Sequence, residues 1–497
     1  MSLENMITQE LIGKHLAFLK KGAVKANDAS DFTSFRNYIK AFSQISYHYN
    51  SSYTDAGAER LLVEASAQFF PQVQIQSLPR KIVFHDSFSA DTRGLTQQYL
   101  RALFSQGVEI LYICSAPEIG RDIGAELSAY GKVQLAFLTE DKESIASVIR
   151  TVEQFRPDKV LLHLAPWDIA SFCLWNSVHN VERYLINLTD HAFWLGTSCA
   201  DYFLEFRRYG AFVSTQYRGI PVDKLLLQPY YPIIDKNAFC GIPHKEGCVT
   251  AFAGGNLYKI SGRNNRFLKL IARVLKGNEN VLFLLAGPGD QKPVLKFIAE
   301  NKLEDRFFLL GNRRDISAVV QHIDIFVNTY PMIGGLMSQY AALFEKPILG
   351  FTDEDLFDFN NVEDLLQVAQ DRTLVVTSEE DFVDRFNRLI DSREARQANV
   401  DHTKECIVTP EAFGGQLFKN LYDKTYRIDG SYFDAVRMNP ASLSATYIDM
   451  ENQYNKAHYL VIWRAIGFRG MLGLRSVPAL FQLAKALFGK VRGKLGC

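Results

Sequence analysis

Two stretches of this chain alternate short apolar runs with helical patterns, and this feature constrains the fold most. Between residues 81 and 188 the apolar runs are KIVFH, VEILYIC, VQLAFL, KVLLHL and YLINL. A segment rich in proline and glycine follows at 230–248, and then come CVTAFAG, NVLFLLAG, RFFLLG, DIFVNTY, KPILGF and TLVVT. Strands that alternate with helices indicate βαβ units and a parallel sheet. The sequence therefore predicts two parallel α/β sheets joined by one linker.

The length of the chain agrees with more than one domain, because 497 residues exceed what one hydrophobic core usually serves. The predicted fold class is α/β with two Rossmann-like parallel-sheet domains. The predicted regions are a helical N-terminal extension at 1–76, a first Rossmann-like domain at 77–232, a second Rossmann-like domain at 248–428, and C-terminal helices that pack back on the first domain, with a basic amphipathic tail, at 429–497.

Composition and charge exclude some classes of protein. Lysine plus arginine and aspartate plus glutamate balance at 55 each, so nothing points to a nucleic-acid partner. The seven cysteines form no CxxC pair, which favours reduced thiols over disulfides or a metal site. The first 21 residues lack the apolar core of a signal peptide, and no run of 18 apolar residues occurs. A cytoplasmic protein is therefore expected.

Glycine and polar residues follow four strands of the second predicted sheet. The segments are GGNLYKISGRNNR after CVTAFA, GPGD after VLFLLA, GNRRD after FFLL, and NTYPMIGG after DIFV. In open parallel sheets, ligands bind outside the carboxyl ends of the strands. One such turn can be explained by turn geometry alone. Four together, two of them cationic, favour a diphosphate site, with Lys259 and Arg263 as cations and Gly334-Gly335 as a backbone cradle.

The order of these segments resembles the nucleotide-sugar half of GT-B glycosyltransferases over about residues 248–350. GNLYKI followed by NTYPMIGG is similar to the O-GlcNAc transferase-like branch. The resemblance implies a nucleotide-diphosphate sugar as co-substrate, with a UDP-sugar favoured, and it places Lys259 and Gly334-Gly335 at the diphosphate. It also implies that the domain at 248–428 is the nucleotide-sugar-binding domain and that the domain at 77–232 lies on the acceptor side. The predicted donor-binding residues are Gly254, Gly255, Asn256, Lys259, Arg263, Gly287, Arg313, Asn328, Gly334 and Gly335.

The sequence departs from the family pattern at two places. Many retaining GT-B enzymes carry two glutamates eight positions apart near this turn, where Asn328 and Leu336 stand here. The Thr-Thr pair that follows the turn in O-GlcNAc transferases is replaced by Leu336-Met337. The donor sugar and the stereochemical outcome therefore stay open. No Asp-x-Asp triplet suggests a metal-held diphosphate, so neither a metal nor a further cofactor is expected.

The first predicted sheet offers candidates for a catalytic base, which an inverting transfer needs near the acceptor hydroxyl. Its polar strand ends, KIVFHDSFSADTRGL and INLTDHAFWLG, contain the titratable residues His85, Asp86, Asp91, Asp190 and His191. We favour His191 with Asp190, because a histidine beside an aspartate after a strand can titrate near neutral pH. Either histidine could instead cap a turn or bond within the core.

The predicted function is transfer of a sugar from a nucleotide-diphosphate sugar to a hydroxyl of a glycan, a lipid-linked glycan or a protein. Two alternatives remain open at the level of the sequence. The first is a nucleotide-sugar epimerase, which shares the same plan. The second is a catalytically silent homologue that acts as a partner or binding subunit.

The C-terminal tail differs from the rest of the chain in charge. Residues 452–497 contain eight lysines and arginines and no acidic residue. Within 478–497, apolar residues from Leu480 to Val491 recur at helical spacing, which is typical of a helix that lies in an anionic membrane interface. The alternative is that these residues pack on the first domain. A peripheral membrane location would suit a lipid-linked or cell-envelope acceptor.

Overall fold

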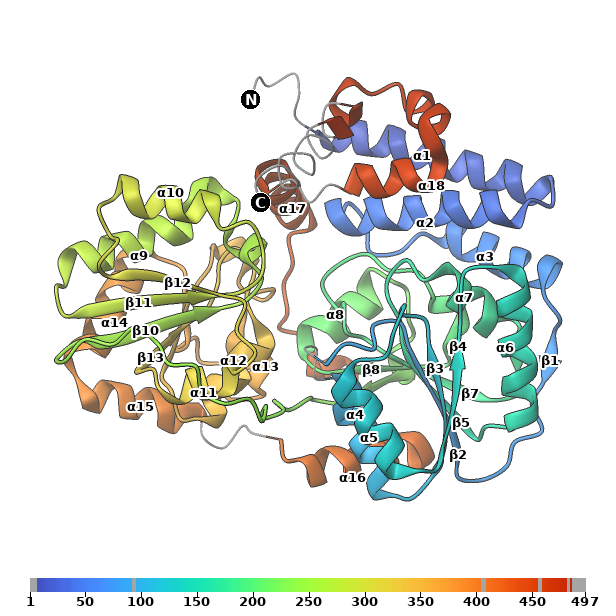
Figure 1. The fold of residues 1–497 in the computed structure, drawn as a ribbon, viewed down its shortest axis with the longest axis horizontal. Helices are drawn as coiled ribbons and strands as arrows, with labels where there is room; N and C mark the ends of the chain where they lie inside the picture. The colour runs from blue at the N-terminus through green and yellow to red at the C-terminus, as the bar shows by residue number, and fades with distance from the viewer. Residues whose placement is uncertain (1–6, 92–94, 404–407, 455–457, 481–482, 485–497) are drawn as a thin grey trace. The chain divides into compact units, whose positions relative to one another are not determined.

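The computed structural model describes residues 7–91, 95–403, 408–454, 458–480 and 483–484, and the chain divides into two compact units (Figure 1). Unit 1 comprises Met1–Gln228, Pro410–Ala435 and Asn455–Cys497, and unit 2 comprises Pro229–Thr409 and Val436–Tyr454. The expected regions differ from these units in two segments. Residues 410–428 belong to unit 1, although they were expected in the second domain. Residues 436–454 belong to unit 2, although they were expected to pack back on the first domain.

Unit 1 contains a seven-stranded parallel sheet in the order β4-β3-β2-β5-β7-β8-β9. Its strands are β2 Lys81–Asp86, β3 Glu109–Cys114, β4 Val133–Phe137, β5 Lys159–His163, β7 Glu182–Ile186, β8 Tyr202–Glu205 and β9 Leu225–Leu227. A separate two-stranded sheet pairs β1 Val73–Gln74 with β6 Val178–His179. The order of the main sheet reverses beside β2, so its switch point lies between β2 and β5.

Helices from three parts of the chain complete unit 1. The sheet is accompanied by α4 Leu95–Ser105, α5 Arg121–Tyr130, α6 Lys142–Phe155, α7 Ile169–Asn176 and α8 Arg208–Gln216. The N-terminal helices are α1 Gln9–Asp28, α2 Phe32–Tyr49 and α3 Ala56–Phe69, and α18 His458–Gly473 lies beside α2 (Figure 1). The Tyr459 hydroxyl lies 2.9 Å from His15 Nδ1, which ties the two ends of the chain together. Helix α16, Pro410–Asp423, packs on α4 through Phe413 against Tyr99, which explains why residues 410–428 join unit 1.

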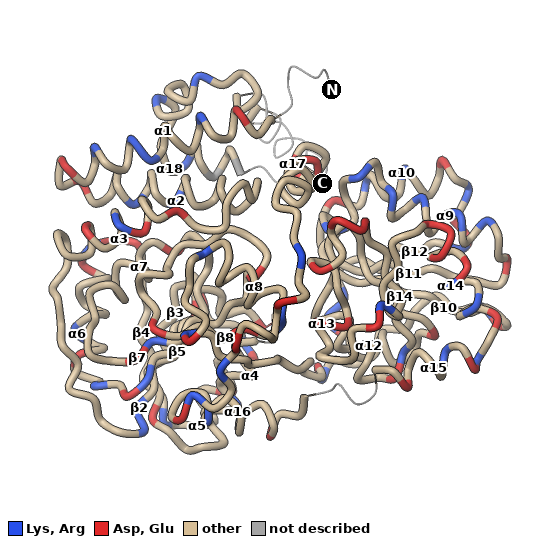
Figure 2. Tube along the Cα trace, turned by 180° about the vertical axis from the view of Figure 1, so that it is seen from behind, with Lys and Arg blue, Asp and Glu red and all other residues tan. Residues whose placement is uncertain are grey.

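Unit 2 contains a six-stranded parallel sheet in the order β12-β11-β10-β13-β14-β15. Its strands are β10 Val249–Gly254, β11 Val281–Ala286, β12 Phe307–Gly311, β13 Ile325–Val327, β14 Ile348–Phe351 and β15 Val375–Val376. None of these strands carries a charged residue, whereas the outer helices carry both signs (Figure 2). A parallel sheet covered on both faces produces such continuous apolar runs. This is why the sequence predicted these strands correctly.

The two faces of this sheet are buried by different helices. Ala251 and Ala253 of β10 point to a core that includes α9 Arg266–Gly277, α10 Lys292–Glu300 and α14 Glu379–Asp391. The intervening residue, Phe252, points to the opposite core. That core includes α11 Ile316–Gln321, α12 Gly335–Leu343 and α13 Val362–Leu366. Alternate residues of a strand point to opposite faces, so one strand serves both cores.

Helix α17, Pro440–Tyr454, completes unit 2, and polar contacts explain its place there. Arg263 donates to the Thr446 hydroxyl at 2.7 Å, and Gly262 N–H donates to the Gln453 side chain at 3.0 Å. Of the tail at 478–497, residues 481–482 and 485–497 lie outside the described residues, so the predicted amphipathic helix is not tested. Within the described part of the chain, no helix combines the length and the apolar character needed to cross a membrane.

Candidate functional site

The switch point of the unit 2 sheet lies between β10 and β13, because β11 and β12 extend to one side and β14 and β15 to the other. Ligands of open α/β sheets bind in the crevice at such a point. Asn328 directly follows β13 and organises the turn there. Its Oδ1 accepts the N–H of Gly334 at 2.8 Å, and its Nδ2 donates to the Ser338 hydroxyl at 2.8 Å. Asn328 therefore fixes the start of α12 at the switch point.

Lys259 reaches the same turn from the neighbouring strand. It lies in the 3-10 turn Leu257–Ile260 that follows β10. Its ammonium group donates to the carbonyl oxygen of Ile333 at 2.9 Å, one residue before Gly334. The structure therefore brings the predicted cation and the predicted glycine turn together within unit 2.

The first turn of α12 presents backbone donors beside this ammonium group. The first backbone hydrogen bond of the helix runs from Ser338 N–H to Gly334 oxygen at 3.0 Å. Among the described residues, no acceptor pairs with the N–H groups of Gly335, Leu336 and Met337. The start of a helix carries a partial positive charge and binds anions through such groups. Lys259 and this helix start can therefore stabilise a diphosphate.

Close packing explains the glycines at the three adjoining strand ends. A Cβ atom on Gly254 would lie 2.9 Å from Met337 Cε, and one on Gly334 would lie 3.3 Å from Gly254 oxygen. Gly287 has a positive φ of 155°, and a Cβ atom there would lie 1.7 Å from Gly255 oxygen. No side chain fits at Gly287 without moving the backbone. The loops after β10, β11 and β13 therefore form one tight cluster.

The side chains of two predicted cations and one predicted polar residue bond to other parts of the protein than the glycine turn. The guanidinium of Arg263 bonds to α17 and lies 3.5 Å from Asp353. Arg313 follows the outer strand β12, where it makes a bidentate ion pair with Asp315 at 2.6 and 2.7 Å. The Asn256 side chain accepts weakly from Tyr258 N–H at 3.5 Å in its own turn. Of the three charged residues predicted for the donor site, only Lys259 lies at the glycine turn.

Sequence reasoning missed Asn360, which is fully buried and holds the glycine turn from behind. Its Nδ2 donates to Pro331 oxygen at 3.0 Å and to the Thr352 hydroxyl at 2.9 Å, and its Oδ1 accepts from Ile333 N–H at 3.2 Å. These partners lie 8 to 29 residues away. No local sequence pattern signals such a contact.

In unit 1, the predicted pair Asp190 and His191 follows β7. His191 Nδ1 lies 3.0 Å from Asp190 Oδ1, and the other oxygen of Asp190 accepts from Arg207. Burial alone would raise the pKa of the Asp190 carboxyl, but the charges of Arg207 and His191 outweigh burial and hold it well below its usual range. The carboxylate is therefore ionised and orients the imidazole. The His191 side chain is 25% exposed, so its outer edge can reach a ligand.

The other titratable candidates of unit 1 have partners within the core. Trp175 Nε1 donates to His85 Nδ1 at 2.7 Å, and burial lowers the pKa of His85 to about 4, so the ring is neutral. Asp86 is fully buried and lies 3.0 Å from His163 Nδ1. Burial opposes ionisation of Asp86, but His163 and several hydrogen bonds bring its pKa to about 2. Asp91 accepts from Asp122 and Ile123 at the start of α5.

Comparisons with known proteins agree with this architecture. No family model and no curated protein matches the chain in sequence. Among solved structures, HepE of Anabaena in complex with UDP and glucose superposes with a TM-score of 0.52 at 12% identity, covering 69% of this chain and 99% of HepE. A mutant O-GlcNAc transferase of Thermobaculum terrenum gives 0.53 at 15% identity, covering 84% and 82%.

A glycosyltransferase from Rickettsia africae also superposes, with a TM-score of 0.50 at 11% identity over 69% of this chain and 98% of that one. At such identities the likeness concerns the fold. It confirms the fold that the sequence predicted from its two series of strands. The chain has the GT-B fold, with two Rossmann-like parallel-sheet units.

Proposed function

We propose that this protein is a glycosyltransferase that moves a sugar from a UDP-sugar to a hydroxyl acceptor. The observation that carries the proposal is the meeting of the Lys259 ammonium group, the glycine turn and the start of α12 at the switch point of unit 2. The fold supports it, because structurally similar HepE is a UDP and UDP-glucose complex. The acceptor class that we propose is a glycan, a lipid-linked glycan or a protein.

The proposed site stabilises the leaving group. When the bond between the anomeric carbon and the diphosphate breaks, negative charge grows on the diphosphate oxygen. Lys259 and the N–H groups of Gly335, Leu336 and Met337 would stabilise that charge, because hydrogen-bond donors already directed at a reacting group lower the free energy of the transition state. In the acceptor-side unit, His191 would remove the proton of the acceptor hydroxyl, with Asp190 stabilising the imidazolium that forms. A base in this role implies inversion at the anomeric carbon.

Replacement of Lys259 tests the donor site. Lys259→Ala removes a charge-assisted contact worth about 1.5–3 kcal/mol. We expect UDP to bind roughly tenfold more weakly or worse, measured by isothermal titration calorimetry. Lys269→Ala is the matched control, because Lys269 is an exposed lysine on α9 of the same unit. Equal UDP affinity in wild type and Lys259→Ala would remove Lys259 from the site.

A second candidate function is favoured by the ion pairs of Arg263 and Arg313. Both guanidinium groups face carboxylates of the protein, so fewer cations remain for a donor than the sequence predicted. A partner subunit that binds a nucleotide without turnover could function with this smaller number of cations. Binding of UDP without any UDP release from UDP-sugars would favour that candidate. Release of an epimeric sugar nucleotide in the absence of acceptor would favour an epimerase.

We also propose that the protein binds peripherally to the cytoplasmic face of a membrane through residues 478–497. The preceding residues Phe468, Leu472 and Val477 are 49–69% exposed, which extends the apolar surface toward the basic tail. We expect the full chain to co-sediment with anionic vesicles at low salt and to be released by high salt. A chain ending at Ser476 and neutral vesicles serve as the controls. Equal sedimentation of both chains would contradict the proposal.

A further inference from the structure

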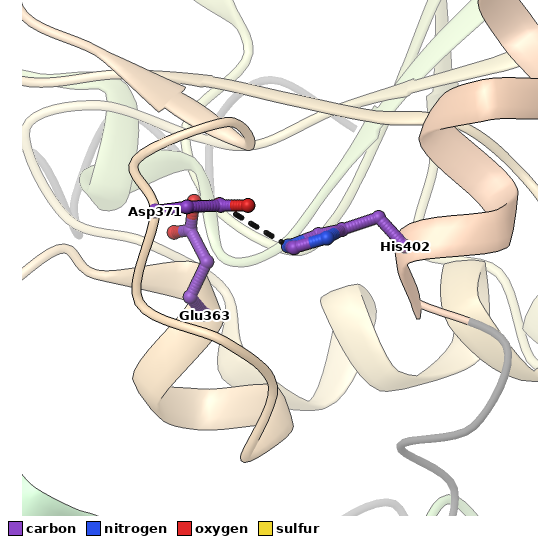
Figure 3. A group of neighbouring side chains, drawn as sticks. All are labelled: Glu363, Asp371 and His402. Carbon is purple, nitrogen blue, oxygen red and sulfur yellow. Dashed lines mark ion pairs between the residues drawn. The ribbon is translucent and has the colours of Figure 1, made fainter.

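Three ligand-type side chains of unit 2 converge at a place that the proposed reaction does not use. They are Glu363 of α13, Asp371 in the loop before β15, and His402 in the last turn of α15 Arg393–Thr403 (Figure 3). One donor atom from each residue lies within 4.8 Å of the other two. His402 Nε2 and Asp371 Oδ1 are 3.4 Å apart. None of the three residues belongs to the loops after β10, β11 or β13.

Glu363 gives an independent reason to expect a cation. It is fully buried, and one carboxylate oxygen accepts the N–H of Leu374 at 2.8 Å. The other oxygen, Oε2, has no hydrogen-bond partner among the described residues, and neither has His402 Nε2. A buried acceptor left without a partner costs free energy, so native proteins rarely leave one. A cation between these atoms would satisfy both of them.

We propose that Glu363, Asp371 and His402 bind a divalent transition-metal ion, with Zn²⁺ as the best fit. One imidazole nitrogen and two carboxylate oxygens form a ligand set that zinc takes, with water in the fourth position. Tetrahedral bonds of about 2.0–2.1 Å separate ligand atoms by roughly 3.4 Å, which matches the observed distance between His402 and Asp371. The exposed Asp371 can move to complete the geometry.

The ion would act as a structural clamp. Glu363 already holds the start of β15 through Leu374, and β15 is the last strand of the unit 2 sheet. His402 lies near the point where the chain leaves unit 2 for Pro410 of unit 1. Coordination would therefore fasten the end of α15 to the edge of the sheet. This role is independent of UDP binding.

The test uses the full chain, stripped with EDTA and then supplied with ZnCl₂. All four tryptophans, Trp167, Trp175, Trp194 and Trp463, lie in unit 1, so a calorimetric transition that tryptophan fluorescence does not follow belongs to unit 2. We expect one retained zinc per chain by elemental analysis. Saturating zinc should raise the melting temperature of the unit 2 transition by about 3 °C or more, through binding to the native state only.

Variants separate coordination from misfolding. His402→Gln and Asp371→Asn should lose the retained zinc and the temperature shift, and Asp371 is exposed, so its replacement does not disturb the core. His244→Gln, at an exposed histidine of the linker, should keep both. Mg²⁺ should give no shift, since it avoids imidazole ligands. No retained zinc in the wild type, an unchanged shift in the two variants, an equal shift with Mg²⁺, or a zinc-dependent UDP affinity would each overturn the proposal.

Discussion

Replacing His191 by alanine is expected to lower turnover by about 10²–10⁴-fold, the contribution typical of a general base. UDP affinity should stay unchanged, because the proposed donor-binding residues belong to unit 2. The physical reason is the ionised Asp190, which holds the imidazole at 3.0 Å and would stabilise its protonated form. The measurement is the rate of UDP release from a UDP-sugar at saturating donor. Added imidazole should restore part of the rate in the variant.

The matched control for this experiment is His179→Ala, a histidine of unit 1 that lies 2.9 Å from the Gln72 side chain. It should keep the wild-type rate. Near-normal turnover in His191→Ala would show that another group removes the proton or that the reaction retains configuration. His85 is not that group, because its ring is buried and bonded to Trp175.

We expect the wild-type protein to lose stability as the pH rises, because of Glu205. Replacing Glu205 by glutamine is expected to abolish this loss. Glu205 is fully buried, and burial raises its pKa to about 7 against an ordinary value of 4.5. The native state therefore holds a proton that the unfolded state has lost, so stability falls between about pH 4.5 and 7. At roughly 1.4 kcal/mol per unit, the loss is about 3 kcal/mol. Glutamine does not titrate, so the variant should not show this loss of stability.

The surroundings of Glu205 accommodate the neutral variant. Asn187 Nδ2 donates to both carboxylate oxygens at 2.9 Å, and the Ser214 hydroxyl donates at 2.6 Å. Asn187 Oδ1 has no hydrogen-bond partner among the described residues. A flip of the Asn187 side-chain amide would exchange its oxygen and nitrogen and would give the glutamine N–H an acceptor. Urea unfolding followed by tryptophan fluorescence reports unit 1 alone. Parallel pH profiles of wild type and Glu205→Gln would contradict the assignment.

Most strands of both sheets could be predicted from the sequence, because a strand buried on both faces leaves a continuous apolar run. Runs such as VLFLLA and DIFV are continuous and apolar, which is the pattern of a covered parallel sheet. Strands β8 and β9 were missed, because charged residues such as Glu205 and Lys224 lie in or beside their apolar runs. The sequence also could not show that α16 belongs to unit 1 and α17 to unit 2. That depends on Phe413 packing on Tyr99 and on Arg263 bonding to Thr446, at sequence separations above 180 residues.

The meeting of the proposed donor-site residues could be predicted in part, because glycine and polar residues after neighbouring parallel strands come together at one edge of the sheet. Lys259 and Gly334 were predicted from their own segments, and the structure brings them together. The partners of Arg263 and Arg313 could not be read from the sequence. Asp315 is only two residues from Arg313, but an ion pair between them depends on the backbone conformation. Asn360 gave no signal, since its partners come from other loops.

The most direct test of the proposed function is a ³¹P NMR time course of the full chain with UDP-sugars, in parallel samples with UDP-glucose and UDP-N-acetylglucosamine. Glycosyl transfer, or slow transfer to water, predicts that the diphosphate signals of one donor decline as signals of free UDP appear. Lys259→Ala should slow this conversion. Spectra that stay unchanged with every donor, in a protein that calorimetry shows to bind UDP, would contradict catalysis and leave a nucleotide-binding subunit.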